Sequence, residues 1–210
     1  MGTLTWKQLR KDMEACEQTS GQSVFAHGKS VYQYLDHLNE LLLGLPQTNN
    51  LEWKLPDWFK TYRNELETEL YMSNITYWYA TYHDCGKPYC KALDEDGKSH
   101  FPNHAESSYQ TWLQVNQDDS INLPEEEIRI IGELILHDMD LHTMNAAQVD
   151  DLINKLSVEQ IVTLLITALA EVHSNAAMFG GIESQSFKMK YKQIERRGRQ
   201  ICKKLFEKGL

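Results

Sequence analysis

Apolar residues recur at intervals of three and four along most of the chain, and this spacing predicts a protein built from helices. Residues with that spacing lie on one face of an α-helix, so each such segment has one side to bury. Alternating patterns that predict half-buried strands are sparse, and we therefore expect an all-α fold. The predicted helices run from Thr3 or Thr5 to about Gln18, Ser23 to Leu43, Trp58 to Leu70, Asn74 to Asp84, Asn103 to Val115, Pro124 to His137, Ala146 to Leu156, Val158 to Asn175 and Ser184 to Lys208.

Glycine, proline and short polar runs separate the predicted helices. Thr19-Ser20-Gly21 and Gly44-Leu45-Pro46 each end a helix, and Pro46 to Pro56 is predicted to be a loop. Asp96-Gly97 is a tight-turn signal within a polar loop. No repeat or low-complexity segment divides the chain, and 210 residues suit one domain.

The composition favours a globular protein over a membrane protein. Hydrophobic residues make up 41% of the chain, which is enough to bury a core. The most apolar run, from Ile161 to Val172, is shorter than the roughly 20 apolar residues of a membrane span. The N-terminus lacks a stretch like a signal peptide, and the four cysteines are scattered without CxxC spacing. We therefore expect a cytoplasmic location, reduced thiols and no membrane partner.

The net charge of −9 is unevenly distributed. The segment from Phe187 to Leu210 has nine basic and two acidic residues, a charge of +7, which leaves −16 for the rest of the chain. An acidic body argues against general affinity for nucleic acid. The basic end has two interpretations: a surface that meets a phosphate or a nucleic-acid end, or the solvated back of a packed helix.

Histidines and acidic residues occupy suggestive places in the predicted helices. His27 lies on the apolar face of its helix, and His83 and Asp84 close another. His104 opens a helix and His137 closes one. Inward-facing donors from separate helix ends are one way to bind a divalent cation. The alternative for each histidine alone is a hydrogen-bonded core residue.

The order and spacing of these residues resemble the HD superfamily of metal-dependent phosphohydrolases. Tyr82 to Pro88, YHDCGKP, is similar to that family's HD-x-G-K-P segment. The continuation, ALDEDGKSHFPNHAESS, is similar to the corresponding stretch of the HD domains of bacterial tRNA nucleotidyltransferases. Upstream, SVFAHGKSVYQYL resembles the helix with the family's first histidine. The resemblance implies a single HD-type helical bundle over residues 1–210, with a motif core over 23–175 and a basic C-terminal helix over 184–208.

The resemblance also implies a set of metal ligands. His27, His83 and Asp84 match the family's ligands, and His104 and His137 match the histidines of members with a second metal. The family usually ends in Ala-Asp, where this chain has Ala170-Glu171, so Glu171 is the expected last ligand. If Glu171 does not serve, the substitutes are Asp138, Asp140 and His173. The long interval between His27 and His83 implies an inserted loop around Trp53 and Trp58.

We therefore expect hydrolysis of a small phosphorylated substrate, such as a nucleotide, a cyclic nucleotide or a nucleic-acid end. One or two divalent ions (Mn, Fe, Co, Ni, Zn or Mg) would acidify water and neutralise a phosphoryl oxygen. Asp84 would ligate the ion and orient the nucleophile, and Lys87 would contact the phosphate. The candidate substrate-binding residues are Lys87, Lys188, Lys190 and Arg196.

Two other functions stay open. The ligand order also resembles HD-fold di-iron oxygenases, which activate oxygen, although Lys87 favours phosphate chemistry. Because Glu171 replaces the usual aspartate, a degenerate HD domain that acts as a binding or regulatory module is the non-enzymatic alternative. Metal analysis of the purified protein would separate these functions.

Overall fold

The computed structural model describes residues 3–19, 21–46 and 51–207. Helices dominate these residues, with two pairs of short strands, and the all-α prediction is confirmed. Parts of the predictions that involve Ser20, residues 47–50 and Lys208 lie outside the described residues. The chain divides into two compact units, of which unit 1 is Met1–Ser30 with Asn74–Asp138 and unit 2 is Val31–Ser73 with Met139–Leu210.

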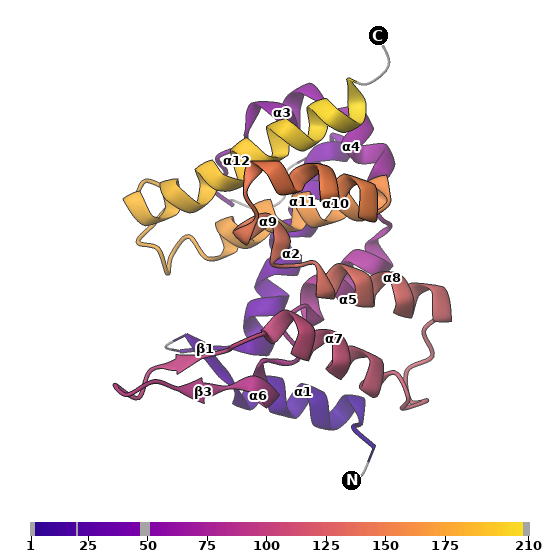
Figure 1. Cartoon of the computed structure of the whole chain (residues 1–210), viewed down its shortest axis with the longest axis vertical. Helices are drawn as coiled ribbons and strands as arrows, with labels where there is room; N and C mark the ends of the chain where they lie inside the picture. Colours follow the sequence, from indigo (N-terminus) through magenta and orange to yellow (C-terminus); the bar gives the residue numbers. More distant parts are fainter. Residues whose placement is uncertain (1–2, 20, 47–50, 208–210) are drawn as a thin grey trace. The chain divides into compact units, whose positions relative to one another are not determined.

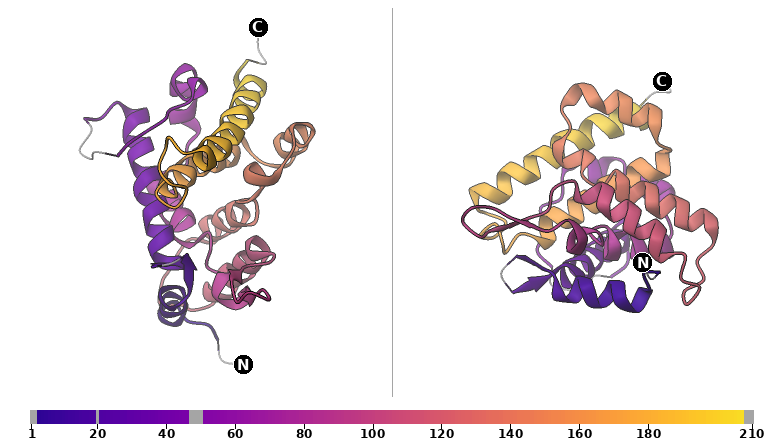
Figure 2. Two further views of the ribbon diagram at one scale, coloured as in Figure 1. Left: turned by 90° about the vertical axis from the view of Figure 1, so that its left-hand side faces the viewer. Right: turned by 60° about the horizontal axis from the view of Figure 1, so that its bottom comes forward.

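Unit 1 combines helices with two antiparallel hairpins, and within it α7 and α8 pack along each other (Figure 1). Its elements are α1 (Trp6–Ala15), β1 (Glu17–Thr19), β2 (Gln22–Ser23), the first residues of α2 (Val24–Leu43), α5 (Ser73–Tyr82), α6 (Lys87–Cys90), β3 (Ala92–Leu93), β4 (Ser99–His100), α7 (His104–Val115) and α8 (Glu125–Leu136). Helical periodicity does not predict the hairpins. The β3–β4 hairpin extends away from α6 and α7 (Figure 2), and its turn has Gly97 at φ +76°, as the Asp96-Gly97 signal predicts.

Aromatic side chains form the core of unit 1. The ring of Trp6 on α1 lies 5.2 Å from Trp78, 5.4 Å from Tyr82 and 5.6 Å from Trp112, measured between centroids. Tilted and edge-on aromatic pairs at these distances stabilise a core beyond their buried area. Thr5 caps α1, because its hydroxyl accepts a hydrogen bond from the backbone N–H of Gln8 at 3.2 Å. The N-terminal helix is thereby fixed to α5 and α7.

Unit 2 is organised around α11, which is buried over almost its whole length. A capping box between Ser157 and Gln160 begins this helix. The predicted helix from Trp58 to Leu70 is interrupted at Tyr62 and forms two shorter helices. The elements of unit 2 are the rest of α2, α3 (Asp57–Thr61), α4 (Arg63–Glu69), α9 (Asp140–Thr143), the 3₁₀ helix η1 (Ala146–Gln148), α10 (Val149–Lys155), α11 (Val158–Ser174) and α12 (Gln185–Phe206).

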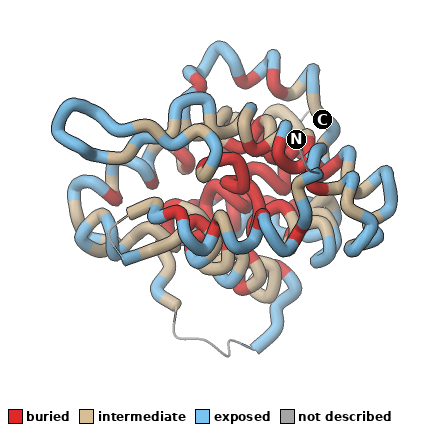
Figure 3. The backbone as a smooth tube through the Cα atoms, turned by 90° about the horizontal axis from the view of Figure 1, so that it is seen from below, coloured by how far each residue is buried: buried red, intermediate tan, exposed pale blue. Residues whose placement is uncertain are grey.

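The last helix, α12, packs on the other helices of unit 2 through an apolar seam. Phe187, Ile194 and Ile201 on this seam are fully buried. Gly198 allows the closest approach, since a Cβ atom there would lie 2.3 Å from the Trp58 ring. Figure 3 shows how buried positions recur on one side of the helices while loops are exposed. Among the described residues, no helix combines the length and apolar character needed to cross a membrane.

His173, on α11, is a buried histidine that stays neutral. Its Nδ1 donates a hydrogen bond to the carbonyl oxygen of Leu169 at 2.8 Å, and its Nε2 accepts one from the backbone N–H of Lys54 at 3.1 Å. The ring lies 4.6 Å from Trp53 and 5.2 Å from Phe187. Burial lowers the pKa of His173 to about 4, although the two backbone hydrogen bonds oppose this shift.

His173 should therefore make stability depend on pH. Because its pKa is lower in the folded than in the unfolded chain, its contribution is complete above about pH 6.5. As the pH falls from about 6.5 to 4, His173 is protonated in the unfolded chain before it is protonated in the folded chain. We therefore expect the free energy of unfolding to fall by roughly 3 kcal/mol over this range. Urea unfolding of the wild type and of His173→Gln at several pH values measures this contribution. Equal slopes of unfolding free energy against pH in the two proteins would contradict it.

Candidate metal centre

Two glycines allow the segments with the candidate ligands to approach at backbone distance. Gly28, directly after His27 on α2, faces α5: a Cβ atom at Gly28 would lie 2.1 Å from the carbonyl oxygen of Thr81. Gly86 lies similarly close to the backbone of α7. Only a residue without a side chain fits at such contacts. Helix α2 is therefore held against α5, and α7 is held against the segment that follows α5.

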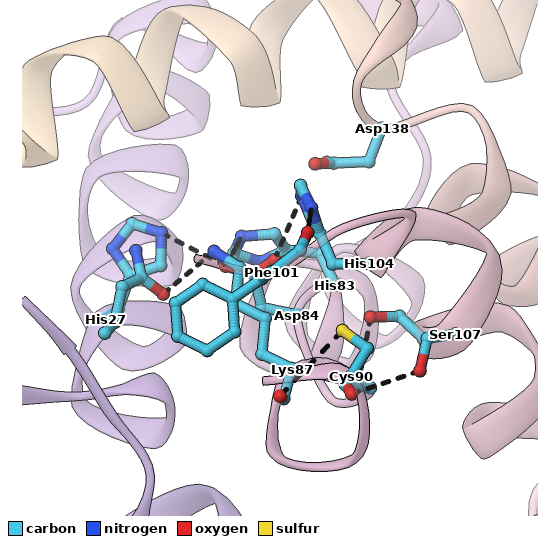
Figure 4. Close-up of polar contacts among 12 residues, drawn as sticks. His27, His83, Asp84, Lys87, Cys90, Phe101, His104, Ser107 and Asp138 are labelled. Atoms are coloured by element: carbon cyan, nitrogen blue, oxygen red, sulfur yellow. Dashed lines mark hydrogen bonds and ion pairs between the residues drawn. The ribbon is translucent and has the colours of Figure 1, made fainter. Parts of the chain in front are cut away.

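His27, His83 and Asp84 form a buried group at this place, with one potential ligand atom from each residue and all three atoms within 4.8 Å of one another (Figure 4). The Oδ2 atom of Asp84 lies 3.2 Å from Nε2 of His83 and 3.8 Å from Nε2 of His27. Nδ1 of His83 donates to the carbonyl oxygen of Ala80 at 2.8 Å. That hydrogen bond leaves the Nε2 lone pair of His83 directed toward the group.

Lys87 lies beside the carboxylate of this group. Its Nζ atom donates hydrogen bonds to Oδ2 of Asp84 at 2.6 Å and to Oε1 of Gln18 at 3.1 Å. The ammonium also lies 5.4 Å from the centre of the Phe101 ring, within the range of a cation–π interaction. Lys87 is itself 9% exposed, so its charge is held in a protected position. Lys87 is therefore fixed beside Asp84 and is not a solvated surface lysine.

Asp84 is ionised in this environment. Burial alone raises the pKa of its carboxyl group, but the positive charge of Lys87 and the neighbouring imidazoles of His83 and His27 outweigh burial. The pKa of Asp84 therefore lies far below its usual value. An ionised, buried carboxylate next to two imidazole nitrogens is a donor set suited to a divalent cation.

His104 borders the group from the start of α7. Its Nε2 atom lies 3.7 Å from Oδ1 of Asp84, and Nδ1 donates to the carbonyl oxygen of Phe101 at 3.1 Å. Asn103, immediately before it, has a left-handed backbone with φ 51°, which turns the chain into the helix. The His104 side chain is 21% exposed, so this edge of the site is accessible to solvent.

His137 and Asp138 follow α8 and are both buried. The hydroxyl of Tyr79 donates to Oδ1 of Asp138 at 2.6 Å. In Figure 4 the carboxyl group of Asp138 points to the same side of the site as the His104 ring. His137 is outside the group of three residues that converge most closely. Its role in a second metal site stays a prediction.

Glu171 belongs to unit 2, where its Oε2 atom lies 3.0 Å from Nε2 of His142. Glu171, His142 and Lys190 line a cavity of about 140 Å³ in that unit. The assignment of Glu171 as the last ligand stays a prediction, as does its substitute Asp140. His173, another substitute, is less suited to a metal, because backbone groups occupy both of its ring nitrogens.

The basic residues predicted to bind substrate at the C-terminal end all lie on α12 in unit 2. Lys188 forms an ion pair with Glu183 at 2.7 Å, whereas Lys190 and Arg196 are exposed. Their contact with a substrate stays a prediction. The structure does establish that they belong to one continuous helix.

Three residues at the site are absent from the sequence-based set: Gln18, Tyr79 and Phe101. Gln18 contacts Lys87 across 69 positions of sequence, and Tyr79 contacts Asp138 across 59. With Glu17, Thr19, Lys98 and Ser99, Gln18 lines a cavity of about 310 Å³. No local pattern identifies a glutamine in a three-residue strand as part of a site. Tyr79 had a signal, since Ile75, Trp78, Tyr79 and Tyr82 recur at intervals of three and four and so share one apolar face of the helix.

Comparison of the chain with protein-family models, curated proteins and solved structures gives no match. The functional interpretation therefore depends on the geometry and chemistry of the residues described above.

Proposed function

We propose that this chain is a metal-dependent phosphohydrolase of the HD type. Its substrate would be a phosphomonoester or phosphodiester, such as a nucleotide, a cyclic nucleotide or a nucleic-acid end. The observation that carries the proposal is the buried group of His27, His83 and Asp84 with Lys87 beside its carboxylate. The order of these residues along the chain supports the HD assignment through the resemblance of YHDCGKP to that family.

The donor atoms of the site fit a divalent cation. His27 and His83 offer imidazole nitrogens and Asp84 offers a carboxylate oxygen, all from buried side chains. The hydrogen bond from Nδ1 of His83 to the carbonyl oxygen of Ala80 fixes the orientation of the His83 ring, as is usual for histidines that bind metals. Such a set binds Mn²⁺, Fe²⁺, Co²⁺, Ni²⁺ and Zn²⁺ without sharp preference. His104, whose Nε2 atom lies 3.7 Å from Oδ1 of Asp84, offers a further donor for a second ion.

A bound divalent ion supplies water acidified toward neutral pH and neutralises negative charge on a phosphoryl oxygen. Residues of the chain orient the attacking water and stabilise the charge of the phosphoryl group. Asp84 offers a second carboxylate oxygen, Oδ1, that can accept a hydrogen bond from the attacking water. Lys87 presents a buried ammonium that stabilises negative charge on the phosphoryl group as the bond to the leaving group breaks. Gln18, which lines the 310 Å³ cavity, accepts a hydrogen bond from Lys87. The cavity has room for the remainder of a small substrate.

Removal and return of metal tests the proposal. Protein stripped with EDTA should show no hydrolysis of nucleoside monophosphates, cyclic nucleotides, or RNA ending in a phosphate or cyclic phosphate. Adding back Mn²⁺, Fe²⁺, Co²⁺, Ni²⁺, Zn²⁺ or Mg²⁺ singly should restore turnover with at least one ion, because the donor set accepts several. Phosphate release and product chromatography measure the activity, and elemental analysis measures whether one or two ions bind.

Two outcomes contradict the proposal. If metal binds but no substrate in the panel is hydrolysed with any ion, the site has another chemistry. If no ion binds and titration with Mn²⁺ or Ni²⁺ does not raise thermal stability, the chain is better described as a degenerate HD domain that acts as a binding module.

A second candidate function is an iron oxygenase. Two histidines and one carboxylate are also the ligand set of non-haem iron enzymes that activate oxygen. The ammonium of Lys87 at 2.6 Å from Asp84 favours the hydrolase, because a fixed cation beside the site serves an anionic phosphate. Iron retained through purification, together with oxygen uptake in place of phosphate release, would reverse this preference.

A further inference from the structure

Positive charge in this chain is concentrated on one rigid element. The segment from Phe187 to Leu210 has a net charge of +7, whereas the rest of the chain carries −16. Most of that segment is the single uninterrupted helix α12 (Figure 1). A concentration of charge on a helix holds the cations at fixed spacings, which a flexible tail would not do.

Some of these cations form a line along the helix, which we call the basic stripe. The intervals of three and four between its members keep them within an arc of about 80° around the helix axis. At 1.5 Å per residue, the line is about 22 Å long. The basic stripe consists of Lys188, Lys192, Arg196, Arg199 and Lys203.

The basic stripe is available to an external anion. All of its members except the half-buried Lys188 are exposed. Arg199 pairs with Glu195 at 3.0 Å, and Lys188 pairs with Glu183 at 2.7 Å. Exposed pairs of this kind contribute little free energy, so a polyanion can compete for both cations. The other three form no ion pair with any residue in the part of the chain that the structure describes.

The packing of α12 argues against a membrane as the partner. A helix that binds a bilayer surface inserts an exposed apolar face. The apolar seam of α12 is instead used inside unit 2, where Phe187, Ile194 and Ile201 are fully buried, and Met189, 68% exposed, is a single apolar residue outside this seam. Its aromatic residues are also occupied: Tyr191 stacks on Phe187, and Phe206 packs on Tyr62. The exposed side of α12 therefore offers mainly charge, with Met189 as its one strongly exposed large apolar side chain among the described residues.

We propose that the basic stripe binds the sugar–phosphate backbone of a single-stranded nucleic acid. A strand presents phosphates at regular intervals along one line, as the stripe presents cations. A duplex presents a broader negative surface than a single strand. The −16 charge outside the Phe187–Leu210 segment would repel that surface. Because α12 has no exposed aromatic ring for base stacking, the basic stripe contacts the phosphates alone, and such contacts carry no information on base sequence. This binding requires neither metal nor hydrolysis.

Fluorescence anisotropy with a labelled oligouridylate tests the proposal. In EDTA, so that hydrolysis cannot interfere, the wild type should bind an oligomer of about 20 nucleotides, which exceeds the usual length of single-strand sites. Affinity should fall steeply between about 50 and 200 mM salt. The double variant Lys192→Glu/Arg196→Glu should bind at least about tenfold more weakly at low salt. A plot of log affinity against log salt concentration should have a slope shallower by about 1.4 for this variant than for the wild type, because two phosphate contacts are lost.

Lys7→Glu/Lys11→Glu is the matched control, because these lysines are also exposed, four residues apart on a helix, and change the net charge equally. The control should keep at least half of the wild-type affinity. The proposal is overturned if the control loses as much affinity as the stripe variant. It is equally overturned if wild-type protein at about 100 μM, the weak end of non-specific binding, leaves the oligouridylate free. Tighter binding to a duplex, to polyglutamate or to phosphatidylserine vesicles would also overturn it.

Discussion

Asp84→Asn is expected to abolish the metal-dependent hydrolysis proposed above. Asparagine keeps the shape of the side chain and can still accept a hydrogen bond from Lys87, but it removes the buried negative charge that a divalent cation requires. Loss of several kcal/mol of charge stabilisation corresponds to a rate reduction of at least about 10³-fold. Phosphate release by the variant and its metal content by elemental analysis give the two measurements.

The exposed Asp119 provides a control for this substitution in the same unit. Asp119→Asn makes the same chemical change away from the site and should retain metal and full turnover. Circular dichroism of both variants checks that the fold is intact. Turnover in Asp84→Asn within a few fold of the wild type would rule out Asp84 as a ligand in the reaction.

Gly28→Ala is expected to have the largest effect on stability. The added Cβ atom would lie 2.1 Å from the carbonyl oxygen and 2.8 Å from the carbonyl carbon of Thr81, and both are backbone atoms. No change of rotamer relieves such a contact, so α2 and α5 must separate. We expect a loss of about 3 kcal/mol or more in the free energy of unfolding. The displacement would also move His27 from His83 and weaken metal binding.

Urea unfolding and metal titration of the variant measure the two effects. Gly97→Ala is a useful comparison, because Gly97 has a positive φ of 76° but no atom within 4 Å of the added Cβ. Backbone strain alone should cost Gly97→Ala only about 1 kcal/mol. If both variants unfold at the same urea concentration, close packing at Gly28 is not the constraint described above.

The longer helices were predictable because they have an apolar face and clear end signals, whereas the four-residue helices α6 and α9 were not predicted. The segment from Val24 to Leu43 differs from its predicted start by one residue, and α11 ends one residue before its predicted end. The break at Tyr62 was not predictable, because the apolar pattern continues through it. The hairpins also escaped prediction, since strands of two or three residues are too short to show alternation.

The candidate site was predictable where its residues are neighbours in sequence or share a helix face. His83 and Asp84 are adjacent, Lys87 is one turn further, and His27 lies on a predicted apolar face. Gln18 was not predictable as a site residue, because its hydrogen bond with Lys87 depends on a hairpin that the sequence does not indicate. His137 was singled out by its place at a helix end and Glu171 by the family resemblance, and the assignment of both as ligands stays a prediction.

The contact between Lys87 and Asp84 also has a consequence for how the protein matures. A carboxylate buried among two imidazoles would destabilise the newly folded chain if it had no counter-charge. Lys87, only three residues further along, supplies that charge from the same turn of chain. Unit 1 can therefore complete its folding with no ion in this group, because Lys87 already balances the charge of Asp84.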